Sequence, residues 1–210
     1  MYKAADTRQC LICHESLDNE THLFSYLYHP QICQQCILQL EILEVNVTIQ
    51  SYPALILYRY NDFFKKILFQ YKALDDYALK DVFLCCFPEL KKKFKNYVIV
   101  TIPSSEKDNN RRGFSPNDEI AKVFSNHIFN GLYKINDYKQ TRQKDRTLIR
   151  KILRIRNGIQ LRNRKVLIFD DVMTSSNTIQ AAISLIEKCH PQSIEILVLS
   201  SPHIHRFLNK

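Results

Sequence analysis

The sequence predicts an α/β fold with a mostly parallel sheet flanked by helices, and two observations indicate it. Short apolar runs rich in Val and Ile occupy residues 97–102, 166–169 and 194–199, and each has the length of a buried strand. Apolar residues recur at helical spacing in the segments between these runs. Strands that alternate with helices favour parallel pairing with right-handed crossovers. A chain of 210 residues suffices for one such domain and a small appendage.

The first part of the chain contains two Cys-x-x-Cys pairs, Cys10/Cys13 and Cys33/Cys36, with nineteen residues between them. This spacing is typical of a zinc knuckle or ribbon. Four thiolates complete a tetrahedral shell and leave no position for water, so the zinc would be structural. Disulfide bonds are the alternative, and a cytosolic chain disfavours them. The sequence therefore predicts a zinc module over residues 1–45.

A second domain is expected over residues 46–210. Its segment 61–94 is predicted to be helical, because apolar side chains recur there at helical spacing until Pro88 interrupts the pattern. The strand at 97–102 should stop at the proline that follows it, and a polar loop is expected over residues 104–114.

A further helix is expected directly after this loop. Ser115 would cap it, Pro116 would occupy its first position, and Asp118 would lie in its first turn. Residues 132–135 are predicted to form a short strand before the chain becomes strongly basic.

The net charge of +9 is concentrated in residues 134–165, where twelve Lys and Arg residues accompany two acidic ones. Such a block predicts contact with the phosphate backbone of nucleic acid, with affinity that falls steeply as salt rises. The alternative is a solvated face that keeps the protein soluble. The residues expected to contact nucleic acid are Arg142, Lys144, Arg146, Arg150, Lys151, Arg154 and Arg156.

Two carboxylates, Asp170 and Asp171, come where the strand 166–169 ends, and a loop rich in hydroxyls leads into a helix. Ligands of open α/β sheets bind beyond the carboxyl ends of the strands, and a helix N-terminus attracts anions. The carboxylates are therefore predicted to accept hydrogen bonds from a ribose diol, while the loop holds a 5′-phosphate. The loop residues proposed for this role are Thr174, Ser175, Ser176, Asn177 and Thr178.

Other classes of site also place an Asp after a hydrophobic strand. Nucleotide-hydrolysing ATPases do so, but they need a glycine-rich loop that ends in Lys and Ser or Thr. The chain has three glycines and none precedes such a pair, so this class is excluded. A purely structural Asp-Asp turn stays open.

This stretch resembles the ribose-phosphate motif of type I phosphoribosyltransferases, Asp-Asp-x-x-Thr-x-Gly-x-Thr. Asp170, Asp171, Thr174 and Thr178 occupy the expected positions, and Ser176 stands where the motif has glycine. Glycine permits positive φ and a close approach of the backbone to phosphate. A serine forced into a left-handed conformation would cost about 1–2 kcal/mol. Whether the chain is an enzyme is therefore left open.

Taken in order, the motifs resemble the ComF/ComFC family of late competence proteins, also called amidophosphoribosyltransferase-like proteins. The resemblance rests on the four cysteines, on Arg112-Gly113-Phe114, on Lys139-Gln140-Thr141 and on the Asp-Asp loop. The family usually has Asn-Gln after its Arg-Gly-Phe motif, where this chain has Ser115 and Pro116. The resemblance implies a type I phosphoribosyltransferase-like domain and a role in natural transformation and DNA uptake, with single-stranded DNA as a partner.

The resemblance also implies a ligand of the phosphoribosyl pyrophosphate type, bound together with Mg²⁺. Asp170 and Asp171 would be the catalytic residues if the protein is active, as in a glycosyltransferase of this family. Arg111 and Arg112 would lie near the pyrophosphate.

Three functions remain open at this point. The first is a DNA-uptake protein that binds single-stranded DNA and keeps a sugar-phosphate pocket. The second is a metabolic phosphoribosyltransferase, and the third is a non-enzymatic adaptor of the transformation machinery. No transmembrane segment or apolar signal core is evident. A cytoplasmic protein is therefore expected, associated with the membrane only through other transformation proteins at its inner face.

Overall fold

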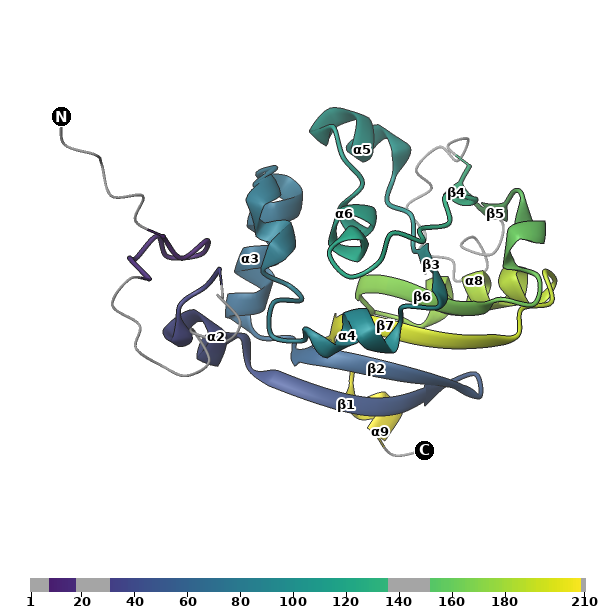
Figure 1. The fold of residues 1–210 in the computed structure, drawn as a ribbon, viewed down its shortest axis with the longest axis horizontal. Coiled ribbons are helices and arrows are strands. Elements are labelled where there is room, and N and C mark those ends of the chain that lie inside the picture. Colours follow the sequence, from purple (N-terminus) through teal and green to yellow (C-terminus); the bar gives the residue numbers. More distant parts are fainter. Residues whose placement is uncertain (1–7, 18–30, 136–151, 209–210) are drawn as a thin grey trace.

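The computed structural model of the protein describes residues 8–17, 31–135 and 152–208. Their centre is a five-stranded sheet with the order β1-β2-β7-β6-β3 (Figure 1). β2, β7, β6 and β3 pair in parallel, and β1 joins the edge antiparallel to β2. The predicted α/β class with a mostly parallel sheet is thus confirmed. The strands are β1 (Ile42–Ile49), β2 (Tyr52–Arg59), β3 (Tyr97–Thr101), β6 (Lys165–Val172) and β7 (Ser193–Ser201).

The hairpin of β1 and β2 is absent from the expectations drawn from the sequence. Its two-residue connection, Gln50 and Ser51, has φ of 49° and 71°, which suits the right-handed twist of the flanking strands. Neither residue is the Gly or Asn that usually marks such a turn. The boundary proposed between residues 45 and 46 lies inside β1, and the division into two domains stays a prediction.

The segment 61–94, which was predicted to be helical, forms three separate helices. Its first part is α3 (Asp62–Ala73), where the Asn61 side chain accepts a hydrogen bond of 2.8 Å from the backbone N–H of Phe64. The second part is less regular than predicted, with the 3₁₀ helix η1 (Tyr77–Asp81) and the short α4 (Glu89–Lys93) that begins after Pro88.

The prediction of a polar loop over residues 104–114 is wrong, because α5 (Glu106–Arg112) lies within it. Acidic residues in its first turn and basic residues in its last complement the helix dipole. Gly113, at φ 79°, ends it. The remaining elements are α2 (Gln34–Leu40), α6 (Pro116–Lys122), β4 (Leu132–Lys134), β5 (Leu153–Ile155), η2 (Gly158–Leu161), α8 (Asn177–Glu187) and α9 (His205–Leu208).

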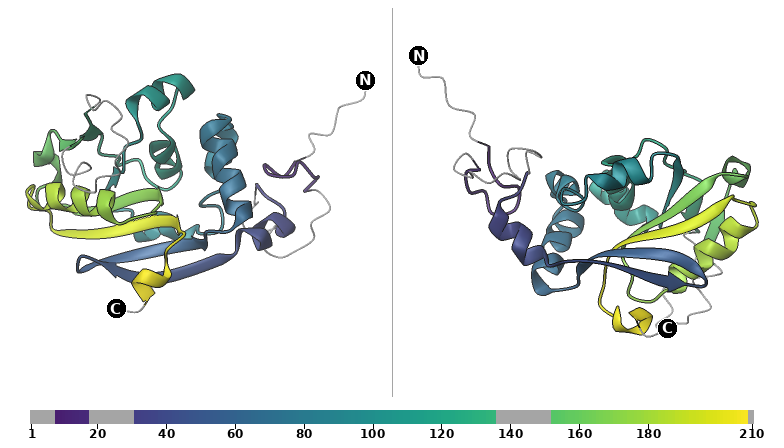
Figure 2. Two further views of the ribbon diagram at one scale, coloured as in Figure 1. Left: turned by 180° about the vertical axis from the view of Figure 1, so that it is seen from behind. Right: turned by 60° about the horizontal axis from the view of Figure 1, so that its bottom comes forward.

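The sheet separates two hydrophobic clusters, because side chains alternate between its faces. In β6, Leu167 and Phe169 join the cluster that contains α3 and α6, while Val166 and Ile168 join the one that contains α8. Figure 2 shows the layers from two further directions, with α9 beside β1. Within the described ranges, no helix is long and apolar enough to cross a membrane.

Candidate functional site

The four predicted metal ligands, Cys10, Cys13, Cys33 and Cys36, meet in one cluster with all sulfur atoms within 4.8 Å of one another. Cys13 Sγ and Cys33 Sγ lie 3.6 Å apart. Sulfur atoms in a tetrahedral shell with bonds of about 2.3 Å are about 3.8 Å apart, so the cluster fits such a shell. All seven cysteines are free, and these four could hold a metal ion.

Electrostatics around the sulfur atoms favour a bound cation. Burial opposes the ionisation of Cys10, but backbone N–H groups outweigh it and lower the pKa of this thiol to about 7. One of them is the N–H of Ile12, 3.4 Å from the sulfur. Burial and the neighbouring thiols raise the pKa of Cys36. Cysteines bind a metal ion as thiolates, and a cation at the centre would offset the repulsion among the four thiolates.

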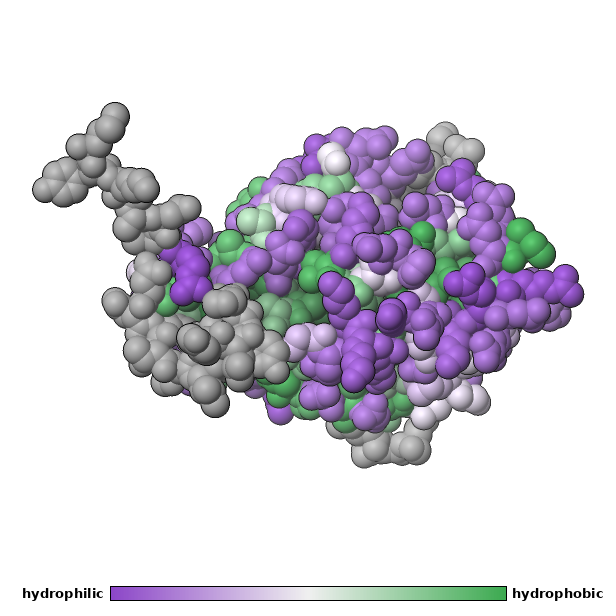
Figure 3. Space-filling view, viewed as in Figure 1, coloured by the Kyte–Doolittle hydropathy of each residue, from purple (hydrophilic) through white to green (hydrophobic). Residues whose placement is uncertain are grey.

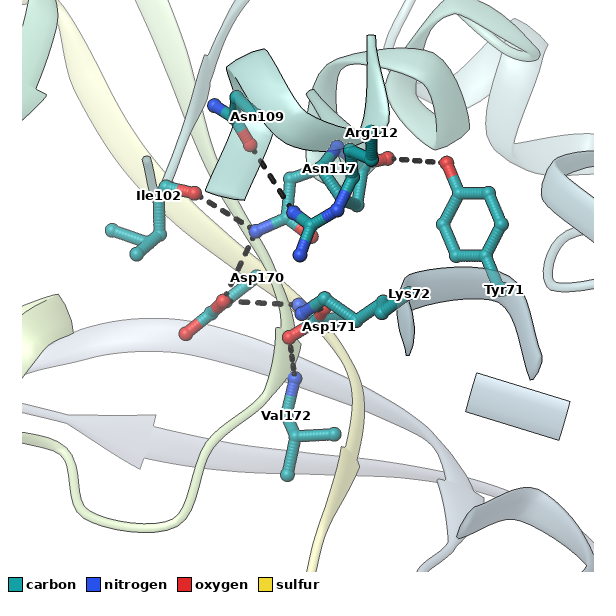
Figure 4. A network of polar contacts seen from close by, with 10 residues as sticks. Tyr71, Lys72, Ile102, Asn109, Arg112, Asn117, Asp170, Asp171 and Val172 are labelled. Atoms are coloured by element: carbon teal, nitrogen blue, oxygen red, sulfur yellow. Dashed lines mark hydrogen bonds and ion pairs between the residues drawn. The ribbon is translucent and has the colours of Figure 1, made fainter. Parts of the chain in front are cut away.

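The carboxylates Asp170 and Asp171 are both buried, at 8% and 5% exposure, close to the end of β6. The Asn117 side chain donates to Asp170 Oδ1 (3.2 Å) and to the carbonyl oxygen of Ile102 (2.9 Å). Lys72 at the end of α3 forms an ion pair with Asp171. Figure 4 shows Lys72 and Asn117 reaching the two carboxylates from different helices. The pair is therefore held by partners on both sides.

Burial raises the pKa of Asp170 to about 7, and the adjacent charge of Asp171 adds to the effect. Lys72 and the hydrogen bond from Asn117 oppose this increase only in part. Near neutral pH, Asp170 thus changes its protonation state while Asp171 faces an ammonium group. The two carboxylates differ in environment, which is common where they have different roles.

The raised pKa of Asp170 predicts a pH-dependent stability. The folded chain holds one more proton than the unfolded chain between the ordinary value of 3.8 and about 7. The free energy of unfolding is therefore expected to fall as pH rises through that window. Asp170→Asn should remove this part of the dependence and be more stable than the wild type above pH 7. Urea unfolding of both proteins across this pH range measures the difference. If the free energies of unfolding of the two proteins change with pH in parallel, the raised pKa of Asp170 is contradicted.

The hydroxyl-rich loop leads from β6 into α8, and Ser176 occupies the N-cap position of this helix. Its φ of −69° and ψ of 0° are right-handed, so the left-handed conformation expected from the missing glycine is wrong, and its cost does not arise. The Ser176 hydroxyl accepts a hydrogen bond of 2.7 Å from Gln180 Nε2 and does not cap the backbone N–H groups. Those N–H groups stay available to an anion.

A hollow of about 230 Å³ opens at this loop, with Thr174, Ser175, Ser176 and Asn177 on one side. Thr174 and Ser175 are exposed, and Thr178 is the second residue of α8. His203 and Arg206, which follow β7, line the opposite side. Sequence reasoning gave these two residues no role. Since β6 and β7 are parallel neighbours, the segments that follow them meet at one edge of the sheet.

Residues 89–207 match the model of the phosphoribosyl transferase domain. The chain belongs to this family. It is also 25% identical over 205 residues to the competence protein ComFC of Bacillus subtilis (strain 168), an alignment that covers 92% of this chain and 84% of that protein. ComFC of Streptococcus pneumoniae (strain ATCC BAA-255 / R6) is 25% identical over 145 residues, which are 68% of this chain and 66% of that protein.

Among solved structures, a hypoxanthine phosphoribosyltransferase from Staphylococcus aureus is similar with a TM-score of 0.37 and 16% identity. The similarity covers 59% of this chain and 63% of that one. The family match and the two ComFC proteins confirm the predicted resemblance and the phosphoribosyltransferase-like fold. Lys72 lies before the residues that match the family model. The ion-pair partner of Asp171 therefore comes from a part of the chain outside the matched range.

Two arginines were expected near a pyrophosphate in the phosphoribosyl transferase domain. Arg111 forms an ion pair of 3.0 Å with Asp75 beyond the end of α3. Arg112 donates to Asn109 Oδ1 over 3.2 Å, and Figure 4 draws it on the side of the carboxylates from which Asn117 also approaches. Its buried Nε has no hydrogen-bond partner within the described residues. Of the two, Arg112 is the better placed to meet a ligand.

A second cleft of about 300 Å³ lies at the end of β3, with Thr101 and Pro103 in its lining. Lys134 and Arg156 supply its positive charge. Burial lowers the pKa of Lys134, while the nearby charge of Asp170 opposes this. Thr101 donates a hydrogen bond to Asp118 on another wall of the cleft. No motif in the sequence indicates that Lys134 lies near enough to Asp170 for their charges to interact.

The residues proposed to contact nucleic acid are only partly described. Arg154 is exposed on β5, and the guanidinium carbon of Arg156 lies 5.6 Å from the centre of the Tyr133 ring. The other five, Arg142, Lys144, Arg146, Arg150 and Lys151, lie outside the described residues. Their role stays a prediction.

Proposed function

We propose that this protein acts in DNA uptake during natural transformation, where it binds single-stranded DNA and keeps a pocket for a ligand of the phosphoribosyl pyrophosphate type. The carboxylate pair beside an uncapped helix N-terminus carries the proposal for the pocket. Similarity to ComFC of Bacillus subtilis along most of the chain supports the role in competence.

In the proposed complex, Asp170 and Asp171 accept hydrogen bonds from the ribose hydroxyls. The loop from Thr174, the N–H groups of α8 and Arg206 hold the 5′-phosphate, because a phosphate needs several donors and positive charge. Arg112 and Lys134 face the pyrophosphate. If the protein is a transferase, these fixed charges would stabilise the departing pyrophosphate and an oxocarbenium-like C1.

Mg²⁺ would accompany the pyrophosphate rather than bind to the carboxylates directly. Both Oδ1 atoms already accept hydrogen bonds, and Asp171 Oδ2 faces Lys72. Mg²⁺ keeps most of its water and is usually bound with substrate phosphates. The metal would neutralise pyrophosphate charge.

We assign structural zinc to the four-cysteine cluster. The sulfur spacing fits a tetrahedral shell, and thiolates with no open position suit a metal that has no catalytic task. Three of the four ligands are buried among apolar residues that also pack with α3. Zinc would thereby fasten the N-terminal residues to the phosphoribosyl transferase domain.

Two titrations test the proposed function. Calorimetry with phosphoribosyl pyrophosphate and Mg²⁺ should show saturable binding at one site per chain. Fluorescence anisotropy with a labelled single-stranded oligonucleotide should show an affinity that falls steeply between 50 and 200 mM salt. If the sugar phosphate does not bind at millimolar concentration, the proposal of a sugar-phosphate pocket is wrong. If the affinity for the oligonucleotide is negligible at low salt, the proposed role in DNA binding is wrong.

Arg206→Ala is expected to weaken binding of phosphoribosyl pyrophosphate by about tenfold or more, because a charged hydrogen bond contributes about 1.5–3 kcal/mol. Arg164→Ala is the matched control, since Arg164 is exposed and precedes β6 at the other end of the sheet. Calorimetric dissociation constants compare the two variants. Equal constants would show that α9 does not contribute to the phosphate site.

A further inference from the structure

A separate cleft of about 540 Å³ lies between α4 and the chain that follows α6. It has no part in the site described above and lies near the start of β3, whereas the carboxylates lie near the end of β6. Within the described residues, its lining contains four lysines and a histidine and has no acidic residue. These basic residues are Lys91, Lys92, Lys95, Lys122 and His127, and we call this region the lysine cleft.

The positive charge of the lysine cleft is mostly uncompensated. Lys91, Lys92 and Lys95 are exposed and form no ion pair with any residue in the described ranges. Lys122 alone has a carboxylate partner, Glu119 at 2.5 Å. Figure 3 shows hydrophilic residues gathered on the part of this face where α4 lies. Several positive charges that line one cleft without acidic partners favour the binding of an anionic partner.

The walls of the lysine cleft are fixed by the core. Phe124 at its base is 5% exposed and packs edge-on against Phe94 and Phe169. The N–H of Ile99 donates to the carbonyl oxygen of His127 over 2.8 Å, which ties one wall to β3. The lysines therefore project from a rigid frame, and little ordering of the backbone is needed when an anion binds.

The lining also determines which part of a nucleic acid would be recognised. Among the described residues of the lining, Phe124 is the one aromatic ring besides His127, and its burial prevents a base from stacking on it. Lysine ammonium groups bind phosphates as point charges. Contacts would therefore go to the backbone, with little dependence on base sequence. Because the lysine cleft is concave, it fits a chain of phosphates better than a flat lipid surface.

We propose that the lysine cleft binds the phosphate backbone of a nucleic-acid strand, as a contact surface separate from residues 134–165. The single-stranded form of this ligand rests on the function proposed above. β3 and β6 start side by side, with Tyr97 paired to Lys165, so the cleft lies at the end of the sheet away from the carboxylates. A strand bound there leaves the sugar-phosphate pocket free.

The test compares Lys92→Ala/Lys95→Ala with the control Lys66→Ala/Lys188→Ala, which removes two exposed lysines elsewhere. Anisotropy with single-stranded dT and dA oligonucleotides of equal length is measured from 50 to 200 mM salt. The cleft variant should bind both oligonucleotides about tenfold more weakly at 50 mM salt. The slope of log affinity against log salt should shrink by about 1.4, or 0.7 for each lost phosphate contact. The control should match the wild type.

The outcomes separate this inference from the proposed function. If the wild type binds the oligonucleotides and the cleft variant behaves like the control, the lysine cleft is overturned while DNA binding stands. If the wild type fails to bind, both are overturned. Sedimentation with vesicles containing phosphatidylserine forms a third arm, and a variant that loses only vesicle binding would assign the cleft to a membrane and overturn the inference. Unchanged binding of phosphoribosyl pyrophosphate shows that the cleft variant is folded.

Discussion

Replacing Cys36 with serine is expected to release zinc and to destabilise the protein by about 4 kcal/mol or more. Cys36 is 3% exposed and shares its cluster of buried residues with Cys10 and Cys33. The variant would leave three clustered thiols without the cation that offsets their repulsion. Zinc content by atomic emission and the free energy of unfolding in urea measure the two effects.

Cys189→Ser is the matched control, because Cys189 is a half-buried cysteine just beyond α8 and away from the cluster. It should retain one zinc ion per chain and most of the stability. A wild-type protein purified without zinc, or a Cys36→Ser protein with its full zinc content, would contradict the metal assignment.

Asp171→Asn is expected to weaken the binding of phosphoribosyl pyrophosphate by about tenfold to a hundredfold. An amide accepts hydrogen bonds from ribose hydroxyls without the charge of a carboxylate, and a charged hydrogen bond contributes about 1.5–3 kcal/mol. The substitution also leaves the ammonium group of Lys72 without its ion-pair partner, so the arrangement of the pocket changes as well. Calorimetry in the presence of Mg²⁺ compares the variant with the wild type.

Asp81→Asn provides the control, since Asp81 also pairs with a lysine, Lys80 at 2.9 Å, but lies in η1. It should bind the ligand like the wild type. An Asp171→Asn protein that binds equally well would identify the Asp-Asp pair as a structural turn, the alternative that the sequence left open. Pyrophosphate release upon addition of a base or amine would instead favour a metabolic transferase.

Local patterns were sufficient for the elements that carry the site. The apolar run at 166–169 lies in the buried stretch of β6, and Ile179, Ala182, Ile183 and Ile186 are buried on α8. The hairpin of β1 and β2 was missed for two reasons. Its turn lacks a glycine signal, and β2 gains its burial from pairing with β7, which lies far along the chain.

Residues close together in the chain were enough to predict the α/β class, the four-cysteine cluster and the loop that follows the two aspartates. What faces that loop depends on the packing of distant segments. Lys72 and Asn117 reach the aspartates across 99 and 53 residues. The residues after β7 join the pocket because that strand lies beside β6. The order of strands in the sheet determines which distant segments come into contact, and no short-range sequence pattern encodes that order.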